Sequence, residues 1–98
     1  MSEAQAVVLL LTIELSIPYA RSLKDKRSAV RGLRDRLRAR FNASVSEVAC
    51  QDKWQRAVLG VALVGSDRRY LESEAARMIR LCEEATDLSL GLIQQEWL

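Results

Sequence analysis

The chain has 98 residues, of which 49% are hydrophobic and 29% charged, with one proline and four glycines. This composition predicts one folded domain over residues 1–98 and excludes a disordered or low-complexity protein. The net charge is +2, and because the sequence has no histidine, histidine-based acid–base catalysis and histidine metal ligands are excluded.

The first predicted element is an apolar strand over residues 6–16, closed by Pro18. Its apolar run is too short to span a membrane, and no basic leader of a signal peptide precedes it. We therefore expect a cytoplasmic protein in which Cys50 and Cys82 are free thiols, because their spacing fits neither a redox motif nor a metal site.

A helix is predicted over residues 23–41. Ser22 would cap its first turn in an S-x-x-D motif with Asp25, and Asn42 would end it in the left-handed conformation. At helical spacing, one stripe of apolar residues faces the core, namely Leu23, Val30, Leu33, Leu37 and Phe41.

The same segment carries most of the positive charge. Residues 21–40 hold nine basic and two acidic residues, a net +7, whereas the rest of the chain holds six basic and eleven acidic residues, a net −5. Spacings of three and four residues place five basic side chains on a second stripe about 90° from the apolar one. We call this the basic stripe: Lys24, Arg27, Arg31, Arg34 and Arg38.

Like charges at these spacings repel one another, which favours an external anion as their partner. Structured RNA is favoured over DNA, because the stripe has no asparagine or glutamine to read bases. A membrane surface is disfavoured, because the apolar stripe is needed for the core. Two alternatives stay open: the stripe is a solvated face, or acidic residues of the second helix neutralise it (Glu72, Glu74, Glu83 and Glu84).

Four further elements follow in chain order. Strands are predicted over residues 43–50, 56–65 and 88–97, and Ser66 would cap a helix whose buried stripe is Leu71, Ala75, Met78 and Cys82. The order β-α-β-β-α-β predicts a ferredoxin-like α+β fold. In this fold a four-stranded antiparallel sheet carries both helices on one face, and the first and third strands are its central pair.

One face of these two central strands is apolar, and the second face is partly apolar, turning polar at Thr12 and Glu14 of the first strand. Val8 and Leu10 lie on the face of the first strand that the helices cannot cover, and Val58, Ala62 and Val64 lie on that face of the third. A second copy of the chain would cover this surface, so we expect a homo-oligomer, most simply a dimer. The alternative is that small residues such as Gly60 leave a mild exposed face.

Three segments carry a resemblance to a known family: SLKDKR at 22–27, RLRARFNASVSEV at 36–48 and QDKWQRAVLGVALVGSDR at 51–68. Together they resemble the YlxP-like proteins, small bacterial proteins of largely uncharacterised function. The resemblance covers nearly the whole chain and implies a ferredoxin-like fold. It also implies a link to translation or ribosome assembly, because the family's genes often lie beside translation-factor genes.

The resemblance directs attention to a candidate interaction loop: Gln51, Asp52, Lys53, Trp54, Gln55 and Arg56. Trp54 could stack on a base, with Lys53 and Arg56 on phosphates. Packing of Trp54 on the core or in a dimer interface is the favoured interpretation, because one aromatic residue does not form an interleaved platform.

No catalytic motif is present. The chain has neither a P-loop nor a G-x-S-x-G motif, and Arg21 has no glycine-rich phosphate cradle beside it. We therefore expect no enzyme, no cofactor and no metal. The leading hypothesis is a non-catalytic RNA- or ribosome-associated protein that uses the basic helix. The alternative is an interaction module that self-associates through its sheet or binds an acidic protein.

Overall fold

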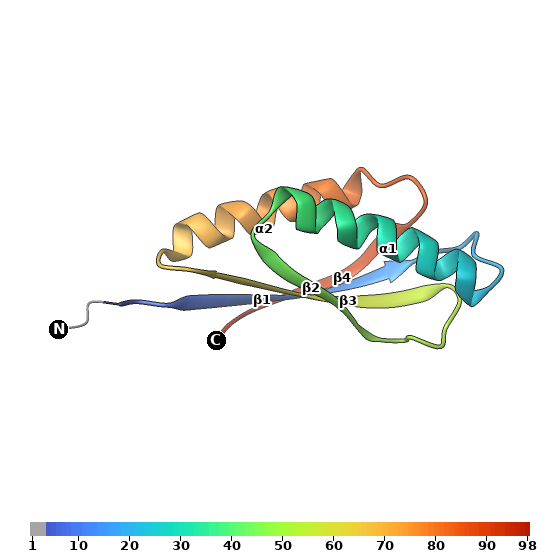
Figure 1. Cartoon of the computed structure of the whole chain (residues 1–98), viewed down its shortest axis with the longest axis horizontal. Helices are drawn as coiled ribbons and strands as arrows, with labels where there is room; N and C mark the ends of the chain where they lie inside the picture. Colours follow the sequence, from blue (N-terminus) through green and yellow to red (C-terminus); the bar gives the residue numbers. More distant parts are fainter. Residues whose placement is uncertain (1–3) are drawn as a thin grey trace.

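The computed structural model describes residues 4–98. The elements follow the predicted order: β1 (Val7–Ser16), α1 (Leu23–Arg40), β2 (Ala43–Ala49), β3 (Arg56–Gly65), α2 (Arg68–Glu83) and β4 (Ser89–Trp97). The four strands form one antiparallel sheet in the order β2-β3-β1-β4, and both helices lie on the same side of it (Figure 1). The predicted ferredoxin-like α+β fold is thus confirmed, with β1 and β3 as the central pair.

The core lies between the sheet and the helices. Leu9, Leu11 and Ile13 of β1 are fully buried, and they pair with Leu63, Val61 and Leu59 of β3. Because side chains alternate along a strand, the residues between them lie on the opposite face of the sheet. We call this the outer face.

Helix α1 begins as predicted. The hydroxyl of Ser22 accepts a hydrogen bond from the backbone N–H of Asp25 at 3.0 Å, and the Asp25 carboxylate accepts one from the backbone N–H of Arg21. These bonds satisfy backbone donors that the first turn leaves without partners.

The predictions for two other helix ends were wrong. The chain leaves α1 through an extended Phe41, and Cys50 is the one non-glycine with a positive φ between residues 4 and 98, so Asn42 does not end the helix in a left-handed conformation. Strand β2 begins at Ala43, so the backbone must already be extended at this point. Helix α2 is capped by Asp67, which accepts from the N–H of Arg69, and not by Ser66.

Neither of the two described helices has the length and hydropathy that crossing a membrane would require.

Candidate nucleic-acid interface

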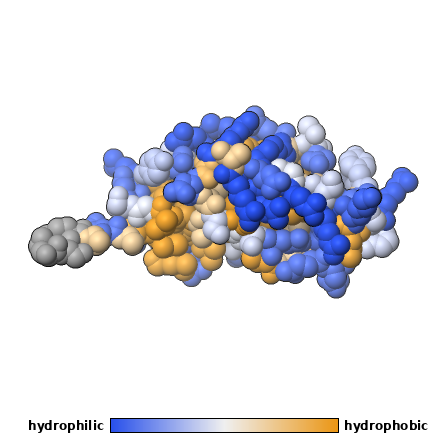
Figure 2. Space-filling view, viewed as in Figure 1, coloured by the Kyte–Doolittle hydropathy of each residue, from blue (hydrophilic) through white to orange (hydrophobic). Residues whose placement is uncertain are grey.

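The basic stripe lies along the exposed side of α1 that faces the edge strand β2. Lys24, Arg27, Arg31 and Arg38 are exposed, and the side chain of Arg34 is 32% exposed. The space-filling view shows a continuous hydrophilic band across this helix (Figure 2). The 3.6-residue period brings the five side chains together as the sequence predicted.

Three stripe side chains have no hydrogen-bond or ion-pair partner in the described part of the chain. Among residues 4–98, no hydrogen bond or ion pair engages the side-chain nitrogens of Lys24, Arg27 or Arg31. Arg34 bonds only its neighbour Asp35, at 3.3 Å and in an exposed position. An exposed pair of this kind contributes little free energy, so the guanidinium of Arg34 can exchange this contact for an external anion at small cost.

The stripe borders two adjacent hollows, and Arg27 and Arg31 line both of them. One hollow, of about 330 Å³, also includes Lys24 and Ser28. The other, of about 210 Å³, includes Arg34 and Glu47. Such hollows let several cationic groups approach one anion from different sides.

Arg38 is anchored differently from the rest of the stripe. Its guanidinium donates a hydrogen bond of 2.6 Å to the backbone carbonyl of Val45. Val45 belongs to β2, an edge strand, so this arginine covers a backbone acceptor that the sheet leaves unpaired. Arg38 therefore fixes the end of the stripe against the sheet and is the member least free to bind a partner.

The acidic residues of α2 do not neutralise the stripe. Of the ion pairs in the described part of the chain, none joins α1 to α2, and Glu74 pairs within α2 with Arg77 at 2.9 Å. The one acidic residue that borders a stripe hollow is Glu47 of β2, which is already paired. Apart from the exposed Arg34–Asp35 pair, the like charges of the stripe are therefore not compensated by an ion pair within the described residues.

The partner of Glu47 is Lys26, a residue that sequence reasoning missed. Lys26 is fully buried, and its Nζ lies 2.6 Å from Oε2 of Glu47. It also donates to the carbonyls of Cys50, Gln51 and Arg56, at 2.8, 3.3 and 3.3 Å. The signal was present in the spacing, because Lys26 stands three residues after Leu23 and four before Val30, on the core-facing stripe.

Lys26 positions the candidate interaction loop, residues 51–56. Cys50, with φ of 63°, opens a turn in which the N–H of Lys53 donates to the Cys50 carbonyl at 3.0 Å. Beyond the turn, Trp54 is 53% exposed. Packing of Trp54 on the core, one half of the favoured interpretation, was therefore wrong, whereas its packing in a dimer interface stays a prediction.

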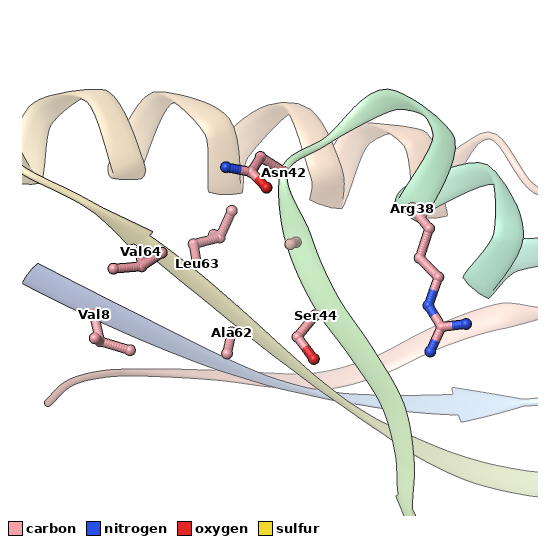
Figure 3. Close-up of a pocket in the computed structure, with 8 residues that line it drawn as sticks. Val8, Arg38, Asn42, Ser44, Ala62, Leu63 and Val64 are labelled. Atoms are coloured by element: carbon pink, nitrogen blue, oxygen red, sulfur yellow. The ribbon is translucent and has the colours of Figure 1, made fainter.

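The outer face of the sheet is partly apolar, and no helix or strand within residues 4–98 covers it. Val8, Leu10 and Glu14 of β1 pair there with Val64, Ala62 and Val58 of β3. Ala62 projects away from the helices whereas Leu63 projects towards them, beside a hollow of about 540 Å³ (Figure 3).

Two more apolar side chains extend this outer face. A register shift in β2 places Val48 over Gly60, where an added Cβ would lie 2.9 Å from Val48 Cγ1, so a larger residue at position 60 would require the Val48 side chain to shift. Leu92 of β4 is 56% exposed, Val48 53% and Val64 58%. These side chains form a patch that water covers in the isolated chain.

The two cysteines are free and differ in environment. Cys82 is buried in α2, and burial raises the pKa of its thiol to about 11, although the charge of Arg36 opposes the shift. Cys50 is half-buried at the start of the loop. In the part of the chain that the structure describes, no cluster of three or more cysteine, aspartate or glutamate side chains is arranged to hold a metal ion.

Comparison with known proteins adds a family and a fold. Residues 8–95 match the family described as "Protein of unknown function (DUF503)". The chain is 35% identical over 84 residues to "Uncharacterized protein YlxP" of Bacillus subtilis (strain 168), a match covering 86% of this chain and 91% of that protein. A solved structure, "De novo designed protein Foldit4", aligns over 94% of this chain and 97% of its own with a TM-score of 0.53 and 12% identity, a likeness of fold alone.

Proposed function

The chain belongs to the DUF503 family of proteins of unknown function, and we propose that it is a non-catalytic protein that binds structured RNA through the basic stripe. The observation that carries this proposal is the set of exposed cationic groups on α1 that have no acidic partner within the described residues. A cation that is paired within the protein already has a counter-charge, whereas these exposed cations of α1 can find one only in solvent or in an external anion.

The dimensions of the stripe fit a nucleic-acid backbone. Lys24 and Arg38 are fourteen residues apart on one helix, about 21 Å at the rise of an α-helix. This length presents cations to several successive phosphates on a rigid support, because α1 packs on the sheet through Val30, Leu33 and Leu37. The flanking hollows give room for phosphate oxygens between neighbouring guanidinium groups.

RNA is favoured over DNA because the stripe offers phosphate contacts without base-reading amides, which suits recognition by shape. Ribosomal RNA is the structured RNA we favour, since the resemblance to YlxP-like proteins implies a link to translation.

The proposal is tested by fluorescence anisotropy of a labelled RNA hairpin titrated with the protein at several salt concentrations. Each phosphate contact releases counterions, so log affinity should fall with log salt by about 0.7 to 0.9 per contact. Four contacts predict a total slope near −3. If no binding is detected at low salt, or if the affinity does not change with salt concentration, the proposal is contradicted. A partner of another class, such as an acidic protein, is then favoured.

A second candidate function is self-association through the outer face, which the apolar patch over β1 and β3 favours. Four strands about 4.8 Å apart and nine residues long cover about 600 Å². Two copies facing each other would bury about 1,200 Å², the lower limit of a specific interface. This function is compatible with the first, because α1 lies on the opposite side of the sheet (Figure 1).

A further inference from the structure

Two loops that are far apart in the sequence are joined at one end of the molecule. The side-chain amide of Gln55 donates to the carbonyls of Pro18 and Ala20, both at 3.2 Å, and the N–H of Ile17 donates to the carbonyl of Gln55 at 3.0 Å. The loop after β1 and the loop after β2 therefore form one continuous surface beside the start of α1 (Figure 1).

This surface presents two aromatic side chains to solvent. Tyr19 lies in the sequence between Pro18 and Ala20, whose carbonyls accept from Gln55, and it is 84% exposed. Trp54 directly precedes Gln55 and is 53% exposed. Burying either ring in a core would remove a large apolar surface from water and stabilise the fold. Their joint exposure at one end of the molecule therefore indicates a contact surface.

Cationic residues lie close to both aromatic residues in the sequence. Lys53 and Arg56 flank Trp54, and Arg21 and Lys24 follow Tyr19, all of them exposed. Among nearby acidic groups, Glu47 is paired with Lys26 and the Asp25 carboxylate accepts from the backbone N–H of Arg21. Asp52 of the loop and Asp87 beside Tyr19 are exposed. Aromatic rings among cations bind single-stranded nucleic acid, because bases stack on the rings while the cations contact phosphates.

A hollow of about 250 Å³ opens beside Tyr19. Its floor is apolar, from Ile17, Ala20 and Ala29, and Asp25 and Asp87 stand at its rim. The carboxylates would repel a phosphate but accept hydrogen bonds from the amino group of a base. The hollow thus suits a base stacked on Tyr19, while the sugar–phosphate backbone follows Lys24 and Arg27 onto the basic stripe.

The loop that carries Trp54 is fixed before any ligand binds. The buried ammonium of Lys26 contacts the carbonyls of Cys50, Gln51 and Arg56, on both sides of the loop. A contact surface held in one conformation loses less entropy on binding.

From these observations, and resting on the proposed function, we propose that Tyr19 and Trp54 stack on unpaired nucleotides that adjoin the structured RNA held by the basic stripe. The ligand class is therefore a helical RNA with a single-stranded extension, and each loop contributes one stacking side chain.

The test compares two labelled RNA hairpins, one blunt and one with a four-nucleotide single-stranded tail, in anisotropy titrations at low salt. Tyr19→Ala and Trp54→Ala should each weaken binding of the tailed hairpin by about 5- to 150-fold, the usual effect of losing one base–aromatic stack. Binding of the blunt hairpin should hardly change. Trp54→Phe keeps an aromatic face and should restore most of the affinity for the tail.

Tyr70→Ala is the matched control, because Tyr70 is also exposed, at 57%, but lies on α2. Its loss should leave both hairpins bound as in the wild type. If the wild type binds both hairpins equally and the loop variants change neither, the stacking inference is overturned while RNA binding by the stripe stands. If neither hairpin binds at all, the proposed function fails together with the inference.

Discussion

The Nζ of Lys26 lies 2.6 Å from Oε2 of Glu47, and no part of Lys26 is accessible to solvent. Through this contact, the first turns of the basic helix are joined to the end of β2 and to the loop that carries Trp54. The same ammonium contacts three loop carbonyls. One buried cation therefore fixes the relative position of the two surfaces to which we assign RNA binding.

Replacing Lys26 by Met should lower the free energy of unfolding by about 2 to 4 kcal/mol, because the carboxylate and the loop carbonyls lose their donor. Denaturant unfolding followed by circular dichroism measures this change. Glu47→Gln is the control: it keeps an acceptor for the ammonium and should cost less. If Lys26→Met is as stable as the wild type, water replaces the ammonium in the variant, and the ammonium does not fix the loop.

Replacing Gly32 by Ala should stabilise the protein. Gly32 is exposed in the middle of α1, and a Cβ added there would meet no atom within 4 Å. Alanine in an exposed helix interior is favoured over glycine by about 0.5 to 1 kcal/mol. A rise in thermal midpoint is expected, with RNA affinity unchanged because no charge is altered. A fall in the midpoint would mean that α1 needs the flexibility of glycine at this position.

Stability should decrease in alkaline solution because of Cys82. Its folded pKa of about 11 is above the ordinary value of 9.0. The contribution of the buried neutral thiol is therefore fully present below pH 9 and is lost as the pH rises towards 11, since the unfolded thiol ionises first. The slope approaches about 1.4 kcal/mol per pH unit.

Unfolding curves between pH 8 and 10.5 for the wild type and Cys82→Ala measure this effect. In Cys82→Ala, the free energy of unfolding should fall less steeply with pH, because the contribution of the thiol is absent. Cys50→Ala, at a half-buried site, is the matched control. Identical pH dependence in wild type and Cys82→Ala would contradict the assignment.

The outer face predicts a concentration-dependent dimer. Light scattering at micromolar concentrations should give a mass above that of one chain, and Val64→Glu should return it to a monomer. Val64 is 58% exposed, so the new carboxylate would be solvated in the monomer but buried in a dimer. Ser73→Glu, at an exposed position on α2, should leave the dimer intact. A monomeric wild type over the whole range would exclude this interface.

The sequence predicted the order of elements, the central strand pair and the basic stripe, because these follow from side-chain periodicity. The burial of Lys26 was not predicted from the sequence, for a physical reason. A lysine normally lies at the surface, and only the tertiary contacts with β2 and the loop make its burial favourable. Likewise, no local pattern reveals that Gln55 joins the two loops, since that contact links positions 35 and 37 residues apart.

Binding of RNA by the basic stripe is tested by comparing two triple variants. Arg27, Arg31 and Arg34 are changed together to Gln, which retains helix propensity and leaves the core-facing side of α1 untouched. The matched control changes Arg69, Arg77 and Arg80 of α2 to Gln, three exposed residues whose loss alters net charge equally.

Anisotropy titrations of one RNA hairpin at several salt concentrations then compare both variants with the wild type. We predict that the α1 variant loses most of its binding at low salt and that its salt slope becomes shallower by about one for each arginine removed. The α2 variant should keep the slope of the wild type. Equal loss in both variants would show that net charge alone attracts RNA, and unchanged binding by the α1 variant would contradict the claim.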